Sequence, residues 1–237
     1  ITNPPFSLFR VFLAWIVEAK KQFIIIGNIN CVTYKEVFPL IQNNSVWMGC
    51  TIHSGDREFE VPEGYPLKAA GWRIDENGKK YIRVKGVRWY TNIDHGRRHH
   101  PLELMTMADN IKYSKHKEVK GKQYSVYDNF EAIEVPYTDA IPKDYDDIMG
   151  VPITFLDKYY PEQFEIVGIT KTWFGMATKV FPKQIQVSKT GKKSVVTKLN
   201  DGAAIEVDGP IEGEVYYNVD GKYYTQAYAR ILIRKKK

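Results

Sequence analysis

The first 52 residues alternate between segments typical of buried strands and segments typical of helices. Residues 22–28, QFIIIGN, form a continuous β-branched run, as expected for a strand that is buried on both faces. A helix is predicted over residues 7–21, another over 34–44, and a further strand over 45–52. With residues 1–2 as the end of an earlier strand, this alternation predicts a doubly wound α/β sheet.

Capping signals set the expected limits of the two helices. Ser7 is a candidate N-cap for the first helix, and Lys20 and Lys21 in its last turn suit the negative end of the helix dipole. Thr33 and Glu36 have the spacing of a capping box ahead of the second helix. Apolar residues cover more than one face of the first helix, so we expect it to pack between the sheet and another layer.

The pattern changes after residue 52, where turn signals separate short alternating segments. Each of three dipeptides predicts a β-hairpin: Asn77-Gly78, Thr190-Gly191 and Asp220-Gly221. The sequence therefore predicts an α/β domain over residues 1–95 and a mixed, mostly antiparallel β region over residues 96–237.

Composition narrows the class of protein. Cys31 and Cys50 lie in apolar surroundings and lack the spacing of zinc ligands, so both are interpreted as core thiols. The longest apolar runs, VFLAWIV and FIIIG, are too short to span a bilayer, and no secretion signal precedes them. We therefore expect a cytoplasmic globular protein without a membrane partner.

A net charge of +6 favours an anionic partner, and the positive charge is concentrated in three loop-like clusters. A solvated surface is the alternative for any single cluster, but three clusters in one chain favour binding to a polyanion. We expect these side chains to contact phosphates, with guanine as a further option for the arginines. The candidate DNA-binding residues are Arg97, Arg98, Lys112, Lys115, Lys117, Lys120, Lys122, Lys189, Lys192 and Lys193.

The HGRRHH cluster could in principle hold a metal ion together with Asp94. His99 and His100 are adjacent, however, so their side chains diverge on regular structure, and no second set of carboxylate and histidine accompanies them. We therefore predict no metal site. Trp89 and Tyr90 precede the cluster in a predicted strand, where either core packing or base stacking would explain them.

The NPPF segment, Asn3–Phe6, follows the end of the first predicted strand, where open α/β sheets place their ligands. Pro4 and Pro5 fix the backbone and remove two amide donors, so carbonyl oxygens are free to point into a cleft. The Asn3 side-chain oxygen and the Pro4 carbonyl can accept both hydrogens of an exocyclic amino group, while Phe6 can stack on a flat ring. These residues predict a pocket for an amino-substituted heterocycle, and a rigid strand-to-helix turn is the alternative.

The GNIN loop follows the second predicted strand. Its Asn28 and Asn30 are therefore expected at the same carboxyl edge of the sheet as Asn3. They are interpreted either as further residues of the pocket or as a plain turn.

Longer blocks of sequence carry a resemblance that four letters alone would not. NPPF resembles the catalytic D/N-P-P-Y/F motif of DNA N6-adenine methyltransferases that use S-adenosylmethionine. Together with it, the blocks IIIGNINCVTYKEVFPLI, GVRWYTNI, YDNFEAIEVP, PKDYDDIMGVPITFLDKYYPEQFEIVG and ARILIRKK resemble the EcoRI-type adenine-specific modification methyltransferases. The resemblance extends from the first residue to the last.

The resemblance implies a site-specific enzyme of a restriction-modification system that transfers a methyl group to N6 of a flipped adenine in double-stranded DNA. The implied catalytic residues are Asn3, Pro4, Pro5 and Phe6. It also implies a Rossmann-like catalytic domain, with its carboxyl-terminal part in residues 1–95 and a target-recognition region in residues 96–237. The transfer itself needs no metal.

Enzymes of this family bind their cofactor through a strand with a Gly-rich turn and an acidic residue on the next strand, ahead of the catalytic motif. Neither feature precedes Asn3 here, so we expect a carboxyl-terminal portion of such an enzyme, with the cofactor-binding residues upstream of Ile1. The expected cofactor is S-adenosylmethionine, bound weakly or not at all by this portion alone. The alternatives are a catalytically inactive DNA-binding remnant and an α/β domain without a nucleic-acid role. We expect a monomer.

Overall fold

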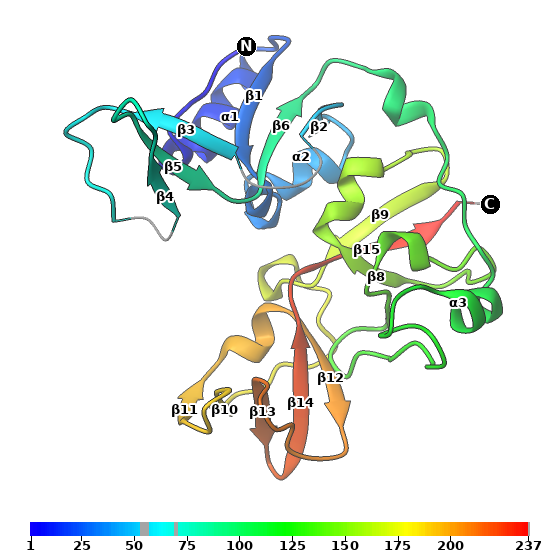
Figure 1. Ribbon diagram of the computed structural model, residues 1–237. Coiled ribbons are helices and arrows are strands. Elements are labelled where there is room, and N and C mark those ends of the chain that lie inside the picture. Colours follow the sequence, from blue (N-terminus) through cyan, green and yellow to red (C-terminus); the bar gives the residue numbers. More distant parts are fainter. Residues whose placement is uncertain (53–56, 69–70, 237) are drawn as a thin grey trace. The chain divides into compact units, whose positions relative to one another are not determined.

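The computed structural model describes residues 1–52, 57–68 and 71–236, and the chain divides into two compact units (Figure 1). Ile1–Arg97 form the amino-terminal unit and Arg98–Lys237 form the carboxyl-terminal unit. Among the described residues, no helix has the length and apolarity needed to cross a membrane.

A three-stranded sheet forms the centre of the amino-terminal unit. Its strand order is β1 (Ile24–Asn28), β6 (Val87–Thr91), β2 (Trp47–Met48), and β6 runs antiparallel to both neighbours. At the other edge of β1, Thr2 forms a parallel bridge with Ile25 through backbone hydrogen bonds of 3.1 and 3.2 Å. An α/β unit is therefore confirmed, but the predicted run of parallel strands is interrupted by β6, which comes much later in the chain.

The first helix follows the predicted order but begins later than its capping signal indicated. A 3-10 turn, η1 (Phe6–Leu8), precedes α1 (Phe9–Glu18), so Ser7 lies inside that turn and does not cap the helix. The last turn of α1 ends before Lys20, whose φ of +52° takes the chain out of the helix.

The predicted capping box of the second helix is wrong. Thr33 ends the 3-10 helix η2 (Ile29–Thr33), and its hydroxyl donates to the Asn30 carbonyl at 2.9 Å. Because this bond to the preceding turn occupies the hydroxyl, the side chain does not cap the next helix. That helix, α2, is limited to Phe38–Gln42 and has a proline in its first turn, a position that suits proline.

Only one face of α1 is covered in the described structure. Phe9 and Leu13 are buried, whereas Leu8, Val11 and Trp15 are 56%, 72% and 60% exposed. The expectation of a second covering layer is therefore not met within this unit.

The contact between α1 and the sheet depends on a glycine in β1. A Cβ added to Gly27 would lie 2.4 Å from Cε2 of Phe9, whose side chain is fully buried and packs 4.8 Å from the ring of Tyr90. We predict that Gly27→Ala lowers the free energy of unfolding by about 1–3 kcal/mol, because the buried ring has no room to move away. Urea denaturation would measure the change.

Gly64→Ala provides the control for this substitution. No atom lies within 4 Å of a Cβ at Gly64, so a change of no more than about 0.5 kcal/mol is expected there. Equal unfolding midpoints for the two variants would contradict the close packing of Phe9 on β1.

The amino-terminal unit also contains a small antiparallel sheet, with the order β3 (Arg57–Val61), β5 (Lys80–Val84), β4 (Trp72–Ile74). Glu58 and Arg73 form an ion pair of 2.8 Å on the charged face of this sheet.

Two sheets build the carboxyl-terminal unit. The first has the order β7 (Ile133–Glu134), β8 (Met149–Pro152), β15 (Arg230–Lys235), β9 (Phe164–Ile169). The second has the order β11 (Lys193–Val196), β10 (Gln184–Val187), β13 (Tyr216–Val219), β14 (Lys222–Ala227), β12 (Ala203–Val207). Among these strand pairs β7–β8 is parallel and the others are antiparallel, which confirms the mostly antiparallel prediction.

Short helical segments connect the strands. They are η3 (Gly96–His99), α3 (Met107–Tyr113), η4 (Thr138–Ala140), η5 (Ile153–Lys158), η6 (Thr172–Phe174) and η7 (Lys198–Asp201). Thr106 caps α3, with its hydroxyl accepting a hydrogen bond of 3.0 Å from the Asp109 amide.

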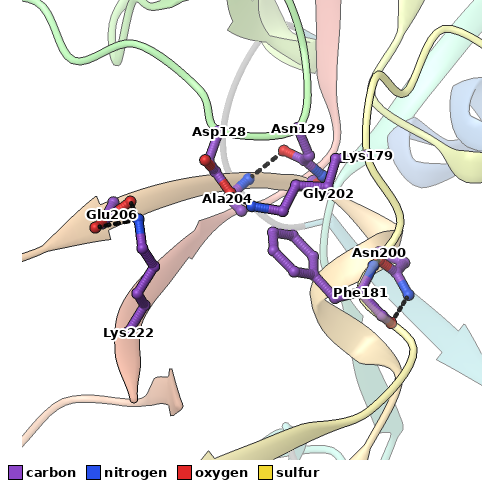
Figure 2. Close-up of polar contacts among 9 residues, drawn as sticks. All are labelled: Asp128, Asn129, Lys179, Phe181, Asn200, Gly202, Ala204, Glu206 and Lys222. Carbon is purple, nitrogen blue, oxygen red and sulfur yellow. Dashed lines mark hydrogen bonds and ion pairs between the residues drawn. The ribbon is translucent and has the colours of Figure 1, made fainter. Parts of the chain in front are cut away.

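A buried asparagine ties a loop to the start of β12 (Figure 2). The Asn129 side chain donates to the Gly202 carbonyl at 3.1 Å and accepts from the Ala204 amide at 2.7 Å. The Asp128 amide adds a bond of 2.8 Å to the Ala204 carbonyl. These bonds satisfy buried backbone groups on both segments and fix their relative position.

All three predicted hairpin turns are confirmed. They join β4 to β5, β10 to β11, and β13 to β14. Gly78, Gly191 and Gly221 have φ values of +80°, +79° and +86°, a region that glycine enters without steric cost. Asp220 also has a positive φ of +49°, so the last turn has the geometry of a two-residue hairpin loop.

Candidate functional site

The NPPF segment turns away from the sheet where the first strand ends. Thr2 is bridged to β1, and after Pro5 the chain enters η1, with the Leu8 amide donating to the Pro5 carbonyl at 2.9 Å. Asn3 is exposed, Pro4 is buried and Phe6 is half-buried. Among the described residues, neither the Asn3 side chain nor the Pro4 carbonyl has a hydrogen-bond partner. Two acceptors thus remain unused at this edge of the sheet.

The register places the GNIN loop at the same edge. Thr2 is aligned in parallel with Ile25, so Asn28 at the end of β1 follows the same direction as Asn3. The Asn28 amide is engaged within the chain: its oxygen accepts from the Asn30 amide at 2.9 Å and its nitrogen donates to the Lys85 carbonyl at 2.7 Å. Asn28 therefore holds the turn, and the Asn30 side chain is exposed.

Tyr90 and Gly86 support this edge, a role that the sequence did not indicate for either residue. The Tyr90 hydroxyl, on β6, donates to the Asn28 carbonyl at 2.8 Å, and the Gly86 carbonyl accepts from the Ile29 amide at 2.7 Å. Gly86 has a φ of +67° and would bring a Cβ to within 3.0 Å of Ile29. Its positive φ and close approach require glycine, which is the one local signal that could have marked this position.

An apolar cavity of about 320 Å³ lies elsewhere in the amino-terminal unit. It is lined by Ile1, Ile24, Gly49, Cys50, Thr51, Trp89, Thr91, Ile93, Asp94 and His95. Residues alternate between the faces of a strand, so the side chain of Trp89 faces away from that of Tyr90, which packs with Phe9 in the core. The cavity does not include any residue of Asn3–Phe6.

The cavity decides two of the sequence interpretations. Cys31 is buried as predicted, but Cys50 is exposed at the cavity, so its interpretation as a core thiol is wrong because the strand ends at Met48. His95 lies with Nε2 2.8 Å from the Met48 carbonyl. No group of three or more metal-binding side chains occurs among the described residues.

The candidate DNA-binding residues differ in how free they are. Arg97 is exposed, whereas Arg98 is half-buried, with its Nε inside the carboxyl-terminal unit. Burial raises the pKa of the Tyr159 hydroxyl, and the nearby Arg98 charge opposes that rise. Arg98 is thus partly committed to internal contacts.

The cluster at residues 112–122 is partly neutralised. Lys115 forms an ion pair of 2.9 Å with Asp139, and Lys112 lies 4.9 Å from the ring centre of Tyr113. Lys122 lines a small cavity of about 130 Å³ together with Glu118. The other two lysines of the cluster, Lys117 and Lys120, are exposed.

The third cluster lies on a hairpin and is open. Lys189, Lys192 and Lys193 surround the turn between β10 and β11 and are exposed. None of the three forms an ion pair with a described residue. This hairpin is the most concentrated unpaired positive charge among the candidate positions.

A buried ionic group lies in the first sheet of the carboxyl-terminal unit. Arg230 binds Glu134 through two nitrogens, at 2.6 and 3.1 Å, and their side chains are only 16% and 10% exposed. The Tyr127 hydroxyl donates to the other oxygen of the same carboxylate. Burial and then the Glu134 charge raise the pKa of Tyr127 well above its ordinary value, so this hydroxyl stays a neutral donor.

Comparison with known proteins places the chain in a family. The family model of the adenine-specific methyltransferase EcoRI matches residues 1–236. The chain therefore belongs to the EcoRI family of adenine-specific methyltransferases. No solved structure gives a significant match.

Individual relatives agree with this assignment. The type II methyltransferase M.EcoRI of Escherichia coli is 45% identical over 171 residues, which is 72% of this chain and 50% of that protein. A type II methyltransferase of Mycoplasma genitalium is 31% identical over 238 residues, covering 99% of this chain and 63% of that protein. M.MpnI of Mycoplasma pneumoniae is 33% identical over 170 residues, covering 70% and 50%. The chain thus spans 50% to 63% of the length of these relatives.

Proposed function

We propose that the enzyme to which this chain belongs methylates N6 of an adenine within a specific sequence of double-stranded DNA. The observation that carries the proposal is the pair of unused acceptors, the Asn3 side-chain oxygen and the Pro4 carbonyl, at the carboxyl end of a strand. Two acceptors side by side match the two hydrogens of the adenine amino group. Phe6 follows at once and offers a ring on which an extrahelical base can stack.

The chemistry follows from these positions. S-adenosylmethionine supplies an electrophilic methyl group when bound, and no residue of this chain is assigned to holding it. Asn3 and Pro4 orient the N6 lone pair by accepting its two hydrogens. Because the nitrogen becomes positive as the N–C bond forms, both acceptors bind it more strongly in the transition state than in the ground state. One N6 proton then leaves to water.

The roles of the two units complete the proposal. The amino-terminal unit would carry the target-base pocket of a Rossmann-like catalytic domain, which the parallel bridge between Thr2 and β1 supports. The carboxyl-terminal unit would recognise the target sequence in the cytoplasm, with its exposed lysines on phosphates. A monomer is part of the same proposal.

Two measurements test this function. Duplex binding should weaken with salt, with a log-log slope near about −5 if roughly six phosphates are neutralised. Methyl transfer from labelled cofactor to a duplex by the full-length enzyme should yield N6-methyladenine. Duplex binding without any methyl transfer would favour the inactive remnant, and neither activity would contradict a nucleic-acid role.

We predict that Phe6→Ala weakens the capture of the flipped base by about 1–3 kcal/mol, because the base loses its stacking partner. A duplex with 2-aminopurine at the target adenine reports flipping as an increase in fluorescence. Tyr65→Ala, which removes an aromatic ring that is 44% exposed in the same unit, should leave the increase unchanged. An unchanged signal in Phe6→Ala would argue against stacking on this ring.

A further inference from the structure

Charge is separated across the five-stranded sheet of the carboxyl-terminal unit. Residues 172–200, which include β10 and the edge strand β11, contain six lysines and no acidic residue. The opposite edge strand, β12, carries Glu206, and the segment after it carries Asp208, Glu212 and Glu214. One edge of the sheet is therefore positive and the other is negative.

The lysines of this sheet also differ in their partners (Figure 2). Lys222 pairs with Glu206 at 2.9 Å, and Lys179 pairs with Asp128 at 2.6 Å, with its ammonium group 4.9 Å from the ring centre of Phe181. These two lysines hold the sheet together. The three lysines at the β10–β11 turn have no such pair among the described residues, so their charge remains available to an external anion.

Apolar side chains lie between these charges on the outer face of the hairpin. Ile185 and Val195 are directly opposite each other in the register of β10 and β11, and they are 40% and 65% exposed. Asn218 of β13 flanks Ile185 on its other side. The three side chains share one face, since cross-strand partners point the same way.

The next row of the same face adds a charge and an aromatic ring. Val187 is aligned with Lys193 of β11 on one side and with Tyr216 of β13 on the other. The opposite face of the hairpin is occupied, because Gln184 is buried and donates to the Phe181 carbonyl at 2.9 Å. Only the face with Ile185 and Val195 can meet a partner.

We propose that the β10–β11 hairpin enters the major groove of the target duplex and contacts base edges there. This inference rests on the proposed function and names the element that recognises the sequence. The major groove admits a two-stranded ribbon, aliphatic side chains contact the thymine methyl group, and lysine can bind guanine O6 and N7. Ile185, Val195 and Lys193 supply these groups, while Tyr216 and Asn218 on the neighbouring strand can bind the phosphate backbone.

A second copy of the chain fits this edge less well. Pairing of β11 with β11 of another copy would bring Lys193 and its neighbouring lysines together across a two-fold interface. Lysines on an edge strand oppose such pairing. Duplex DNA instead offers a dense row of negative charge to the same side chains.

The lysines are tested by salt dependence in the full-length enzyme. The variant Lys189→Ala/Lys192→Ala/Lys193→Ala should lower the magnitude of the log-log salt slope by about 3, one for each lost phosphate or base contact. The variant Lys21→Ala/Lys35→Ala/Lys68→Ala removes the same charge from exposed positions of the amino-terminal unit and should change the slope by less than about 1. Equal changes in the two variants would overturn the assignment of the hairpin.

The apolar pair is tested by specificity. Ile185→Ser/Val195→Ser should lower the ratio of specific to non-specific duplex affinity by about tenfold or more, with little effect on the salt slope. Wild-type enzyme should protect guanine N7 within its site from dimethyl sulfate, and the lysine variant should lose that protection.

The outcomes separate this inference from the proposed function. If the enzyme methylates adenine but both hairpin variants keep wild-type specificity, slope and N7 protection, the hairpin inference is overturned and the proposed function stands. If the wild-type enzyme neither binds nor methylates duplex DNA, the proposed function fails first. A change in the molar mass of DNA-free protein on mutation of the lysines would show that the edge binds a second copy, which also contradicts the inference.

Discussion

Asn3→Ala in the full-length enzyme is expected to slow methyl transfer by about 100-fold or more while leaving duplex affinity nearly unchanged. The side-chain oxygen is unpartnered at the strand end, so it is free to accept a hydrogen bond from adenine N6. That bond strengthens only as positive charge develops on the nitrogen, and losing such an oriented acceptor costs about 2.7–4 kcal/mol of transition-state stabilisation.

Single-turnover methylation and equilibrium binding measure the two quantities separately. Asn3→Asp keeps an acceptor oxygen at the same position and should retain more activity than Asn3→Ala. Asn77→Ala, in the exposed turn between β4 and β5, is the matched control and should behave as wild type. A loss of affinity as large as the loss of rate would show that Asn3 only binds or supports structure.

Glu134→Ala is expected to lower the stability of the carboxyl-terminal unit by about 3–5 kcal/mol. Removal of the carboxylate leaves the Arg230 guanidinium in a site that is only 16% exposed, and it also deprives the Tyr127 hydroxyl of its acceptor. An uncompensated buried charge accounts for most of this cost.

The same sheet provides a control for the ionic pair. Arg234 and Glu165 pair at 2.9 Å with side chains that are 48% and 49% exposed, so Glu165→Ala should cost no more than about 1 kcal/mol. Chemical denaturation of both variants measures the difference. Similar midpoints would mean that solvent reaches the Glu134 pair, against the buried geometry.

The sequence predicted local features well. The three hairpin turns follow from two adjacent residues whose φ values only glycine, or asparagine and aspartate, adopt readily. Strand β1 follows from a β-branched run. The helix starts failed because Ser7 and Thr33 form 3-10 turns, in which competing local hydrogen bonds occupy the backbone and the Thr33 hydroxyl.

Long-range pairing could not be predicted in the same way. β6 lies between β1 and β2 although it follows the small β3-β5-β4 sheet in the chain, and no periodicity announces that insertion. The role of Asn28 depends on it, because the Lys85 carbonyl and the Tyr90 hydroxyl that bind this residue come from the segment around β6.

The candidate site shows the same division. The position of Asn3–Phe6 at a strand end follows from the motif and the preceding apolar residues, as the parallel bridge of Thr2 requires. The basic residues were recognised by composition, but their availability was not. Only tertiary contacts distinguish Lys115, paired with Asp139, from Lys192, which has no ion pair among the described residues.

Long-read sequencing that detects methylated bases, applied to DNA from cells that express the full-length enzyme or its Asn3→Ala variant, tests the central claim most directly. The account predicts N6-methyladenine at one recurrent sequence with the wild-type enzyme and its loss with the variant. Methylation of a different base, or the same adenine methylation with and without Asn3, would contradict it.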